Sequence, residues 1–158
     1  MMPTTTLNET EKCFLAKAEQ YCAQNEQCRH GVAEKLRAWG ADKELTENIV
    51  EKLVEEGFID EERYCRLYCD SKLRLNKWGR IKIAYQLRAK HINSETIEDA
   101  LRHIDETEYR SILEQLAKTK MKTIHDEDPR RKEAKLMTFL ASHGFEKNEI
   151  YQVTKNLK

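Results

Sequence analysis

The sequence has few of the residues that interrupt helices and no spacing of cysteines that would form a disulfide framework. Its 158 residues include two prolines and five glycines, so little of the chain is forced out of helical geometry. Its cysteines number five, which is odd, and they are not regularly spaced. This usage is typical of a reducing compartment. The composition therefore favours a protein that is helical nearly throughout.

The chain also lacks net charge and long apolar runs. Its 28 basic residues balance 28 acidic ones, so no global field attracts nucleic acid or a membrane surface. No apolar run approaches the roughly 18 residues of a membrane-spanning helix, and residues 1–6 have neither the basic nor the apolar region of a signal peptide. We expect a soluble, cytoplasmic protein that meets any charged partner with a local patch.

Charged residues make up 35% of the chain and apolar residues 39%, which predicts a thin core. Residues 1–57 hold seven basic and eleven acidic groups, residues 58–105 ten and eight, and residues 106–158 eleven and nine. The excess of positive charge therefore lies in the middle and C-terminal thirds.

Apolar residues recur at helical spacing in three successive groups. In the first, Asn8 with Glu11 forms a capping box, Gly40 stops a second helix, and Thr46 caps a third that ends at Gly57. The second group has helices from about 60 to 75, from about 79 and from about 94. The third has helices at about 107–125, from Pro129 and at 147–157.

Short segments of these groups match one another. Leu36-Arg37-Ala38 matches Leu87-Arg88-Ala89 at a shift of 51 residues, and Leu140-Ala141-Ser142 follows at 53. A period near 50 built from three helices indicates a repeat protein, in which each unit is stabilised by its neighbours. We therefore predict an all-α fold of three tandem three-helix repeats, at 9–57, 58–105 and 106–158, stacked into an elongated, curved array.

The stretch from Lys72 to Lys90 has seven basic residues and no acidic one, with Trp78 and Tyr85 among them. Several cations within reach of one phosphate backbone or one acidic surface indicate a partner-binding surface. The alternative is an ordinary solvated face. Candidate residues here are Lys72, Arg74, Lys77, Trp78, Arg80, Lys82, Arg88 and Lys90. Trp78 stacks on a partner or is buried between the two helices that it joins.

A second basic cluster lies on both sides of the turn Asp126-Glu127-Asp128. Its candidate residues are Lys118, Lys120, Lys122, Arg130, Arg131, Lys132 and Lys135. They extend the same surface or merely solvate their helices. The acidic run from Glu44 to Glu62 either meets a basic partner or keeps its helices soluble.

Nothing in the sequence indicates catalysis. Cys65 and Cys69 lie one helical turn apart, but no second pair of cysteines or histidines completes a four-ligand metal site. The five histidines are scattered, and no phosphate-binding glycine loop or paired-carboxylate motif is present. We expect buried, reduced thiols, no cofactor, no metal and no enzymatic activity.

Three segments resemble the RecX family, the bacterial modulators of the RecA recombinase. They are Leu36-Arg37-Ala38-Trp39-Gly40, the run Gly57-Phe58-Ile59-Asp60-Glu61 with Arg63-Tyr64, and Gly79-Arg80-Ile81 leading to Gln86-Leu87. The resemblance extends from about residue 11 to 157, and its third repeat is matched mainly by pattern around Gly144-Phe145. His91 departs from the family, which usually has glycine there, at a turn expected to need a positive φ.

The resemblance implies a non-enzymatic, monomeric protein that binds the RecA filament on DNA. It would inhibit ATP hydrolysis, strand exchange or filament growth, and so act in homologous recombination, DNA repair and the SOS response. Contact with single- or double-stranded DNA would be weaker or indirect, and no membrane is implied. A general nucleic-acid-binding helical module and a protein scaffold without recombinase specificity remain as alternatives.

From helix geometry alone, Lys77, Arg80 and Arg88 lie broadly on one side of the fifth helix, away from the core. We expect that reversing these three charges together weakens partner binding while far-UV circular dichroism shows unchanged helicity.

Overall fold

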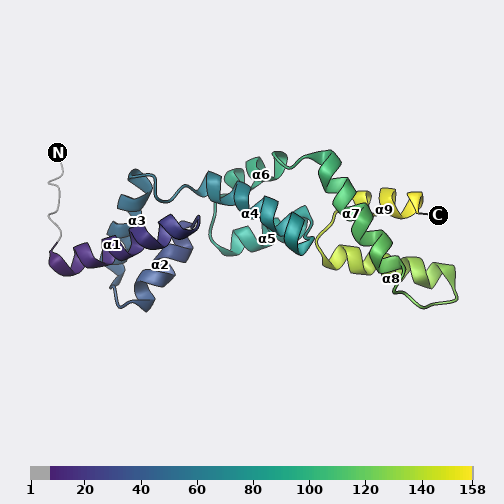
Figure 1. Ribbon diagram of the computed structural model, residues 1–158, viewed down its shortest axis with the longest axis horizontal. Helices are drawn as coiled ribbons and strands as arrows, with labels where there is room; N and C mark the ends of the chain where they lie inside the picture. The colour runs from purple at the N-terminus through teal and green to yellow at the C-terminus, as the bar shows by residue number, and fades with distance from the viewer. Residues whose placement is uncertain (1–7, 158) are drawn as a thin grey trace. The chain divides into compact units, whose positions relative to one another are not determined.

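The computed structural model describes residues 8–157, which contain nine α-helices and no β-strand (Figure 1). The all-α prediction is therefore confirmed for these residues. The helices are α1 (Glu9–Gln24), α2 (Arg29–Ala38), α3 (Lys43–Glu55), α4 (Glu61–Asn76), α5 (Arg80–Ala89), α6 (Ser94–Arg102), α7 (Glu106–Met121), α8 (Pro129–Ser142) and α9 (Lys147–Asn156). Residues 1–6, on which the absence of a signal peptide was judged, and Lys158 of the predicted third repeat lie outside the described residues.

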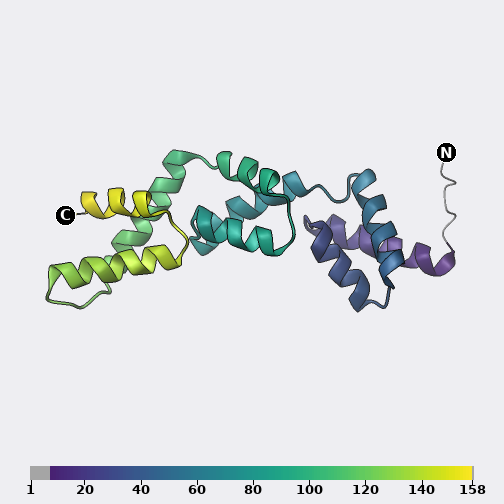
Figure 2. The same ribbon diagram turned by 180° about the vertical axis from the view of Figure 1, so that it is seen from behind.

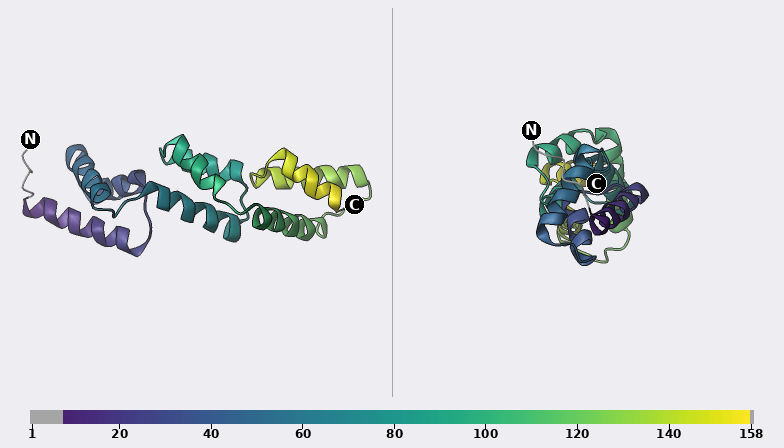
Figure 3. Two further views of the ribbon diagram at one scale, coloured as in Figure 1. Left: turned by 90° about the horizontal axis from the view of Figure 1, so that it is seen from above. Right: turned by 90° about the vertical axis from the view of Figure 1, so that its left-hand side faces the viewer.

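The chain divides into two compact units, Met1–Tyr64 and Cys65–Lys158. In the first unit α1, α2 and α3 pack together (Figure 3). Their shared core includes Ala18, Leu36 and Leu53, each fully buried. The division falls inside α4, so the predicted repeat boundaries at 57/58 and 105/106, like the curvature of the stack, stay predictions.

Polar caps fix where the helices begin. Asn8 forms the predicted capping box with Glu11. The predicted Thr46 cap is wrong, because the Asp42 carboxylate accepts a 2.8 Å hydrogen bond from the Leu45 amide and starts α3 four residues earlier. An aspartate is the stronger acceptor for a free helix amide. Thr46 instead lies buried inside α3.

In the second unit α7, α8 and α9 pack pairwise against one another (Figure 2). Tyr109, Leu113, Leu136 and Leu140 are fully buried there, and Phe145 is 2% exposed. Helix α7 ends at Met121 rather than near His125, where prediction had placed its end. The buried Ile124 lies in the connection that follows.

Two residues without a glycine's freedom have left-handed backbone conformations. His91 has φ of 60°, which confirms the positive φ expected at this turn. Lys77 has φ of 57° in the connection between α4 and α5, and no sequence signal indicated it. Residues with a Cβ atom are uncommon in this region.

The start of α5 contacts the end of α8 through the backbone. The Gly79 amide donates to the His143 carbonyl at 2.7 Å, and the Ile81 amide donates to the Gly144 carbonyl at 2.9 Å. A Cβ atom on Gly79 would lie 2.5 Å from the carbonyl carbon of Gly144. Only glycine lets these two segments of the backbone approach this closely. The contact joins the predicted second and third repeats.

We predict that Gly144→Ala destabilises the protein more than Gly40→Ala. Both glycines have a positive φ, but a methyl group on Gly144 would lie 2.5 Å from the Lys82 amide nitrogen, whereas nothing lies within 4 Å of one on Gly40. Urea unfolding should show a loss of about 1 kcal/mol for Gly40→Ala from backbone strain. Gly144→Ala should lose about 3 kcal/mol or more because overpacking adds to that strain. Equal losses would contradict the tight contact.

Candidate partner-binding surface

Arg80 is held by carboxylates at the contact between α5 and the predicted third repeat. Its guanidinium lies 2.8 Å from a Glu146 oxygen and 2.6 Å from a Glu106 oxygen, and its side chain is 16% exposed. The guanidinium carbon also lies 3.9 Å from the Tyr109 ring centroid. Burial opposes the charge on Arg80, but its hydrogen bonds with Glu146 and Glu106 outweigh that effect and raise its pKa. Arg80 is therefore a structural cation.

Tyr109 completes this network from the core. Its hydroxyl donates to Glu146 and accepts from the Arg80 backbone amide at 3.1 Å. Burial, followed by the hydrogen bond to Glu146, raises the pKa of Tyr109. Its ring packs against Phe145 with centroids 5.4 Å apart. Neither Tyr109 nor Glu146 was singled out in the sequence, and neither carries a local signal for this role.

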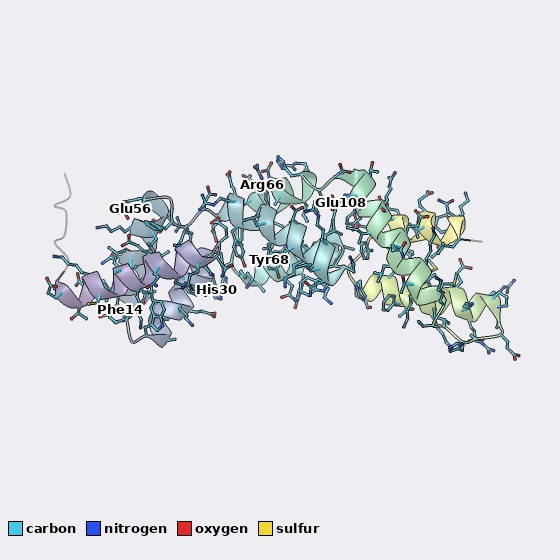
Figure 4. All side chains as sticks on the ribbon, in the orientation of Figure 1. Phe14, His30, Glu56, Arg66, Tyr68 and Glu108 are labelled. Carbon is cyan, nitrogen blue, oxygen red and sulfur yellow. The ribbon has the colours of Figure 1, made fainter. Side chains whose placement is uncertain are left out.

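Two further cations of the stretch from Lys72 to Lys90 also contact groups of the protein itself. Arg74 pairs with Glu108, labelled in Figure 4, at 3.1 Å between Nη2 and Oε2, and with Asp70 at 3.5 Å. Lys77 Nζ donates to the Arg74 carbonyl at 2.5 Å, and its own carbonyl lies 2.9 Å from Nδ1 of His143. The Arg74–Glu108 pair joins α4 to α7 and leaves less charge for a partner, whereas the Lys77 contacts stabilise the α4–α5 connection.

Lys72 and Lys82 lie over one aromatic ring. Their ammonium groups are 5.0 and 4.9 Å from the Trp78 centroid. Lys72 also lies 5.5 Å from the ring centroid of Tyr68, which is labelled in Figure 4. Trp78 is half-buried, with its amide donating to the Lys72 carbonyl at 3.1 Å. Within residues 8–157, neither lysine has a carboxylate within ion-pair distance. The structure thus brings together Lys72, Trp78 and Lys82 out of the predicted set.

Arg88 and Lys90 lie towards the end of α5, where Arg88 is exposed and Lys90 is half-buried. Apolar side chains near these cations in the sequence were not among the predicted residues, which were chosen mainly for their charge. Leu75 is 78% exposed and Ile81 is 57% exposed. The signal for Ile81 was present, because Ile81, Tyr85 and Arg88 follow one another at spacings of four and three.

The second basic cluster is partly neutralised by Asp126. This carboxylate, 9% exposed, lies 3.0 Å from Lys135 Nζ and 3.4 Å from Arg131 Nε. The Asp128 amide donates to it at 3.0 Å, and this bond, followed by that from Lys135, lowers the pKa of Asp126. Arg131 and Lys135 therefore stabilise the α7–α8 connection.

The remaining cations of this cluster differ in their surroundings. Lys118 pairs with Glu114 at 3.1 Å, and Lys120 lies 4.6 Å from the centroid of Phe139. A hollow of about 500 Å³ is lined by Gln115, Lys118, Met121, Lys122, Lys132 and Leu157. Arg130 is exposed at the start of α8. This hollow combines positive charge with an apolar lining and stays a candidate for partner binding.

The cysteines behave as structural thiols. None of the five, all within residues 8–157, forms a disulfide, and Cys65 and Cys69 are buried. Burial raises the pKa of Cys69 to about 11, so its thiolate is scarce at neutral pH. The described residues contain no group of three or more histidine, cysteine or carboxylate side chains that could hold a metal ion.

Several members of the acidic run act inside the first unit. Glu51 lies 2.5 Å from Arg29, and Glu61 accepts from the Arg29 amide at 3.2 Å. Asp60 caps α4 by accepting from the Arg63 amide at 3.1 Å. These contacts favour the structural interpretation of these three carboxylates.

Comparison with known proteins identifies relatives of the whole described chain. Models named "RecX, second three-helix domain" and "RecX, third three-helix domain" match residues 60–101 and 106–154. A "Regulatory protein RecX" from Prosthecochloris aestuarii is 31% identical over 153 residues, 95% of this chain and 96% of that protein. One from Clostridium tetani is 33% identical over 128 residues, 80% of this chain.

The chain spans 58% of the Clostridium tetani protein and 57% of a similar one from Clostridium acetobutylicum. Among solved structures, RecX from Lactobacillus salivarius has a TM-score of 0.84 at 22% identity, covering 96% of this chain and 98% of its own. A second solved structure, of a regulatory protein RecX, has a TM-score of 0.80 at 24% identity, and the match covers 99% of this chain and 81% of that one. These likenesses show the fold.

The ion pairs correct our charge-reversal expectation, because reversing Arg80 would place a carboxylate beside Glu106 and Glu146. We predict instead that Arg80→Gln lowers the free energy of unfolding by about 2 kcal/mol or more, since it leaves a partly buried carboxylate without its cation. Arg74→Gln is the matched control, since its side chain is 55% exposed, and it should lose clearly less stability because solvent screens exposed ion pairs. Urea unfolding measures both. A smaller loss for Arg80→Gln would contradict the structural role.

Proposed function

The chain belongs to the RecX family, and from this we propose that it is a non-catalytic regulator that binds the RecA filament on DNA. Binding lowers ATP hydrolysis, strand exchange or filament growth, and the protein acts in homologous recombination, DNA repair and the SOS response. The observation that carries the proposal is the match of 31% identity over nearly all of both chains with the Prosthecochloris relative named as regulatory.

The surface chemistry supports a partner-binding role. Lys72 and Lys82 are not neutralised by carboxylates of the described chain, and exposed apolar side chains lie near them in the sequence. Exposed apolar groups mark interaction sites, and cations without a carboxylate of their own beside such groups are complementary to an acidic partner. We propose that this binding role requires no cofactor and no metal.

We further propose that the protein acts in the cytoplasm as a monomer and that its contact with DNA is weak or indirect. No helix in the described part of the chain is long and apolar enough to cross a membrane. Of the predicted cations, five are engaged by carboxylates of the protein itself: Arg74, Arg80, Lys118, Arg131 and Lys135. Each engaged cation leaves one fewer to displace counterions from DNA.

An ATPase assay tests the function. RecA is assembled on single-stranded DNA with ATP, and the chain is added at fewer copies than RecA. We expect ATP turnover to fall, because one regulator bound to a filament affects more than one subunit. Binding of the chain to the same DNA without RecA is measured in parallel by fluorescence anisotropy.

Unchanged ATP turnover together with tight binding to naked DNA would replace this proposal with a general nucleic-acid-binding module. Unchanged turnover without binding to DNA or filament would favour a scaffold for some other protein. The Arg74→Gln variant serves as a folded control, because its lost ion pairs lie on the surface.

A further inference from the structure

Large exposed hydrophobic side chains gather on α4 and α5. In the described residues there are five of them, Leu67, Leu75, Ile81, Tyr85 and Tyr151, and only Tyr151 lies elsewhere. Scattered exposed apolar residues are ordinary on a protein surface. Four on two consecutive helices are a concentration that solvation does not explain, and such concentrations mark interaction sites.

The outer side of α5 carries a stripe of mixed chemistry. Ile81 and Tyr85 are one turn apart, and Arg88 follows almost one turn later. Ile81 is 57% and Tyr85 is 68% exposed, whereas Ile83, Ala84 and Leu87 are buried on the opposite side of the same helix. Helix α5 therefore has two apolar sides, one in the core and one in solvent.

A set of cation–aromatic contacts connects this stripe with α4. Lys82 follows Ile81 directly and precedes Tyr85 by three residues, and its ammonium group lies over Trp78. Lys72 of α4 lies over the same indole, and Leu75 follows Lys72 by three residues on that helix. We name these residues the α4–α5 face: Lys72, Leu75, Trp78, Ile81, Lys82 and Tyr85.

We propose that the α4–α5 face binds an acidic protein segment that also carries apolar side chains. The inference rests on the proposed function, and within it the segment belongs to a protein subunit of the filament and not to its DNA. Carboxylates of the segment pair with Lys72 and Lys82, while its apolar side chains cover Leu75, Ile81 and Tyr85.

Charge complementarity supports an acidic partner. The stretch from Lys72 to Lys90 contains no acidic residue, and the carboxylates that reach it from elsewhere engage Arg74 and Arg80. No carboxylate of the described residues lies within ion-pair distance of Lys72 or Lys82, and both lie beside apolar surface. The apolar side chains exclude water around a partner carboxylate that binds there. The attraction between that carboxylate and the lysines is therefore stronger than in water.

The aliphatic side chains favour protein over nucleic acid. Bases stack on aromatic rings and phosphates pair with cations, so a site for single-stranded DNA combines those two groups. Leu75 and Ile81 offer neither interaction. Their exposed surface is covered well by apolar side chains of a protein, as in the centre of protein–protein interfaces.

A double substitution tests the apolar part of the face. Ile81→Ser with Tyr85→Ser removes apolar surface without changing charge, and Tyr151→Ser is the matched control on α9, where Tyr151 is 55% exposed. We expect the double variant to bind the RecA–DNA filament about tenfold or more weakly and the control to bind as the unaltered chain does. Circular dichroism and urea unfolding verify that both variants fold.

A photo-crosslinking residue in place of Tyr85 identifies the molecule that is contacted. With the full chain on the filament, we expect crosslinks to the RecA protein, and none from the same residue at position 151. Crosslinks to DNA, or unchanged binding by the double variant, would overturn the inference while leaving the proposed function intact. If the unaltered chain neither binds the filament nor lowers its ATP turnover, the proposed function itself fails, and this inference fails with it.

Discussion

The contact between Gly79 and Gly144 determines which cations of the second unit face solvent. Two backbone hydrogen bonds hold the start of α5 against the end of α8. Arg80 comes next in the chain, so its guanidinium is carried to Glu146 and Glu106 and onto the Tyr109 ring. A side chain that looks like a surface cation in the sequence thereby becomes part of the contact between predicted repeats. The proposed partner-binding surface consists of the cations that this contact leaves in solvent.

The helices were predictable from local signals in the sequence, whereas the ion pairs were not. Caps such as Asn8 and stops such as Gly40 act within a few residues, so the sequence specifies them. The Thr46 error arose because Asp42, also able to cap, stood four residues earlier. Arg80 and Glu146 are 66 residues apart, and no local pattern indicates that the fold brings them together. The positive φ at His91 was predictable from the resemblance, because the family usually has glycine there, but that of Lys77 was not.

Counting charges therefore overstated the basic surface of this protein. In a chain with zero net charge, a fold brings many cations to its own carboxylates, as Asp126 does with Arg131 and Lys135. Such pairs contribute modestly to stability when exposed and more when partly buried. Lys72 and Lys82 differ because their neighbour is an indole ring. An aromatic ring holds an ammonium group in place without neutralising its charge.

The contacts of these two lysines with Trp78 reduce the side-chain entropy that they lose when a partner binds. An exposed lysine loses side-chain entropy when a partner fixes it, and that loss weakens association. Lys72 and Lys82 already lie about 5 Å from the Trp78 centroid, so part of their freedom is lost before a partner arrives. Two like charges near one ring repel each other, and a partner carboxylate beside either lysine offsets part of that repulsion. The α4–α5 face is thus prepared for negative charge, and the exposed Ile81 and Tyr85 beside it restrict the partner to one that also presents apolar surface.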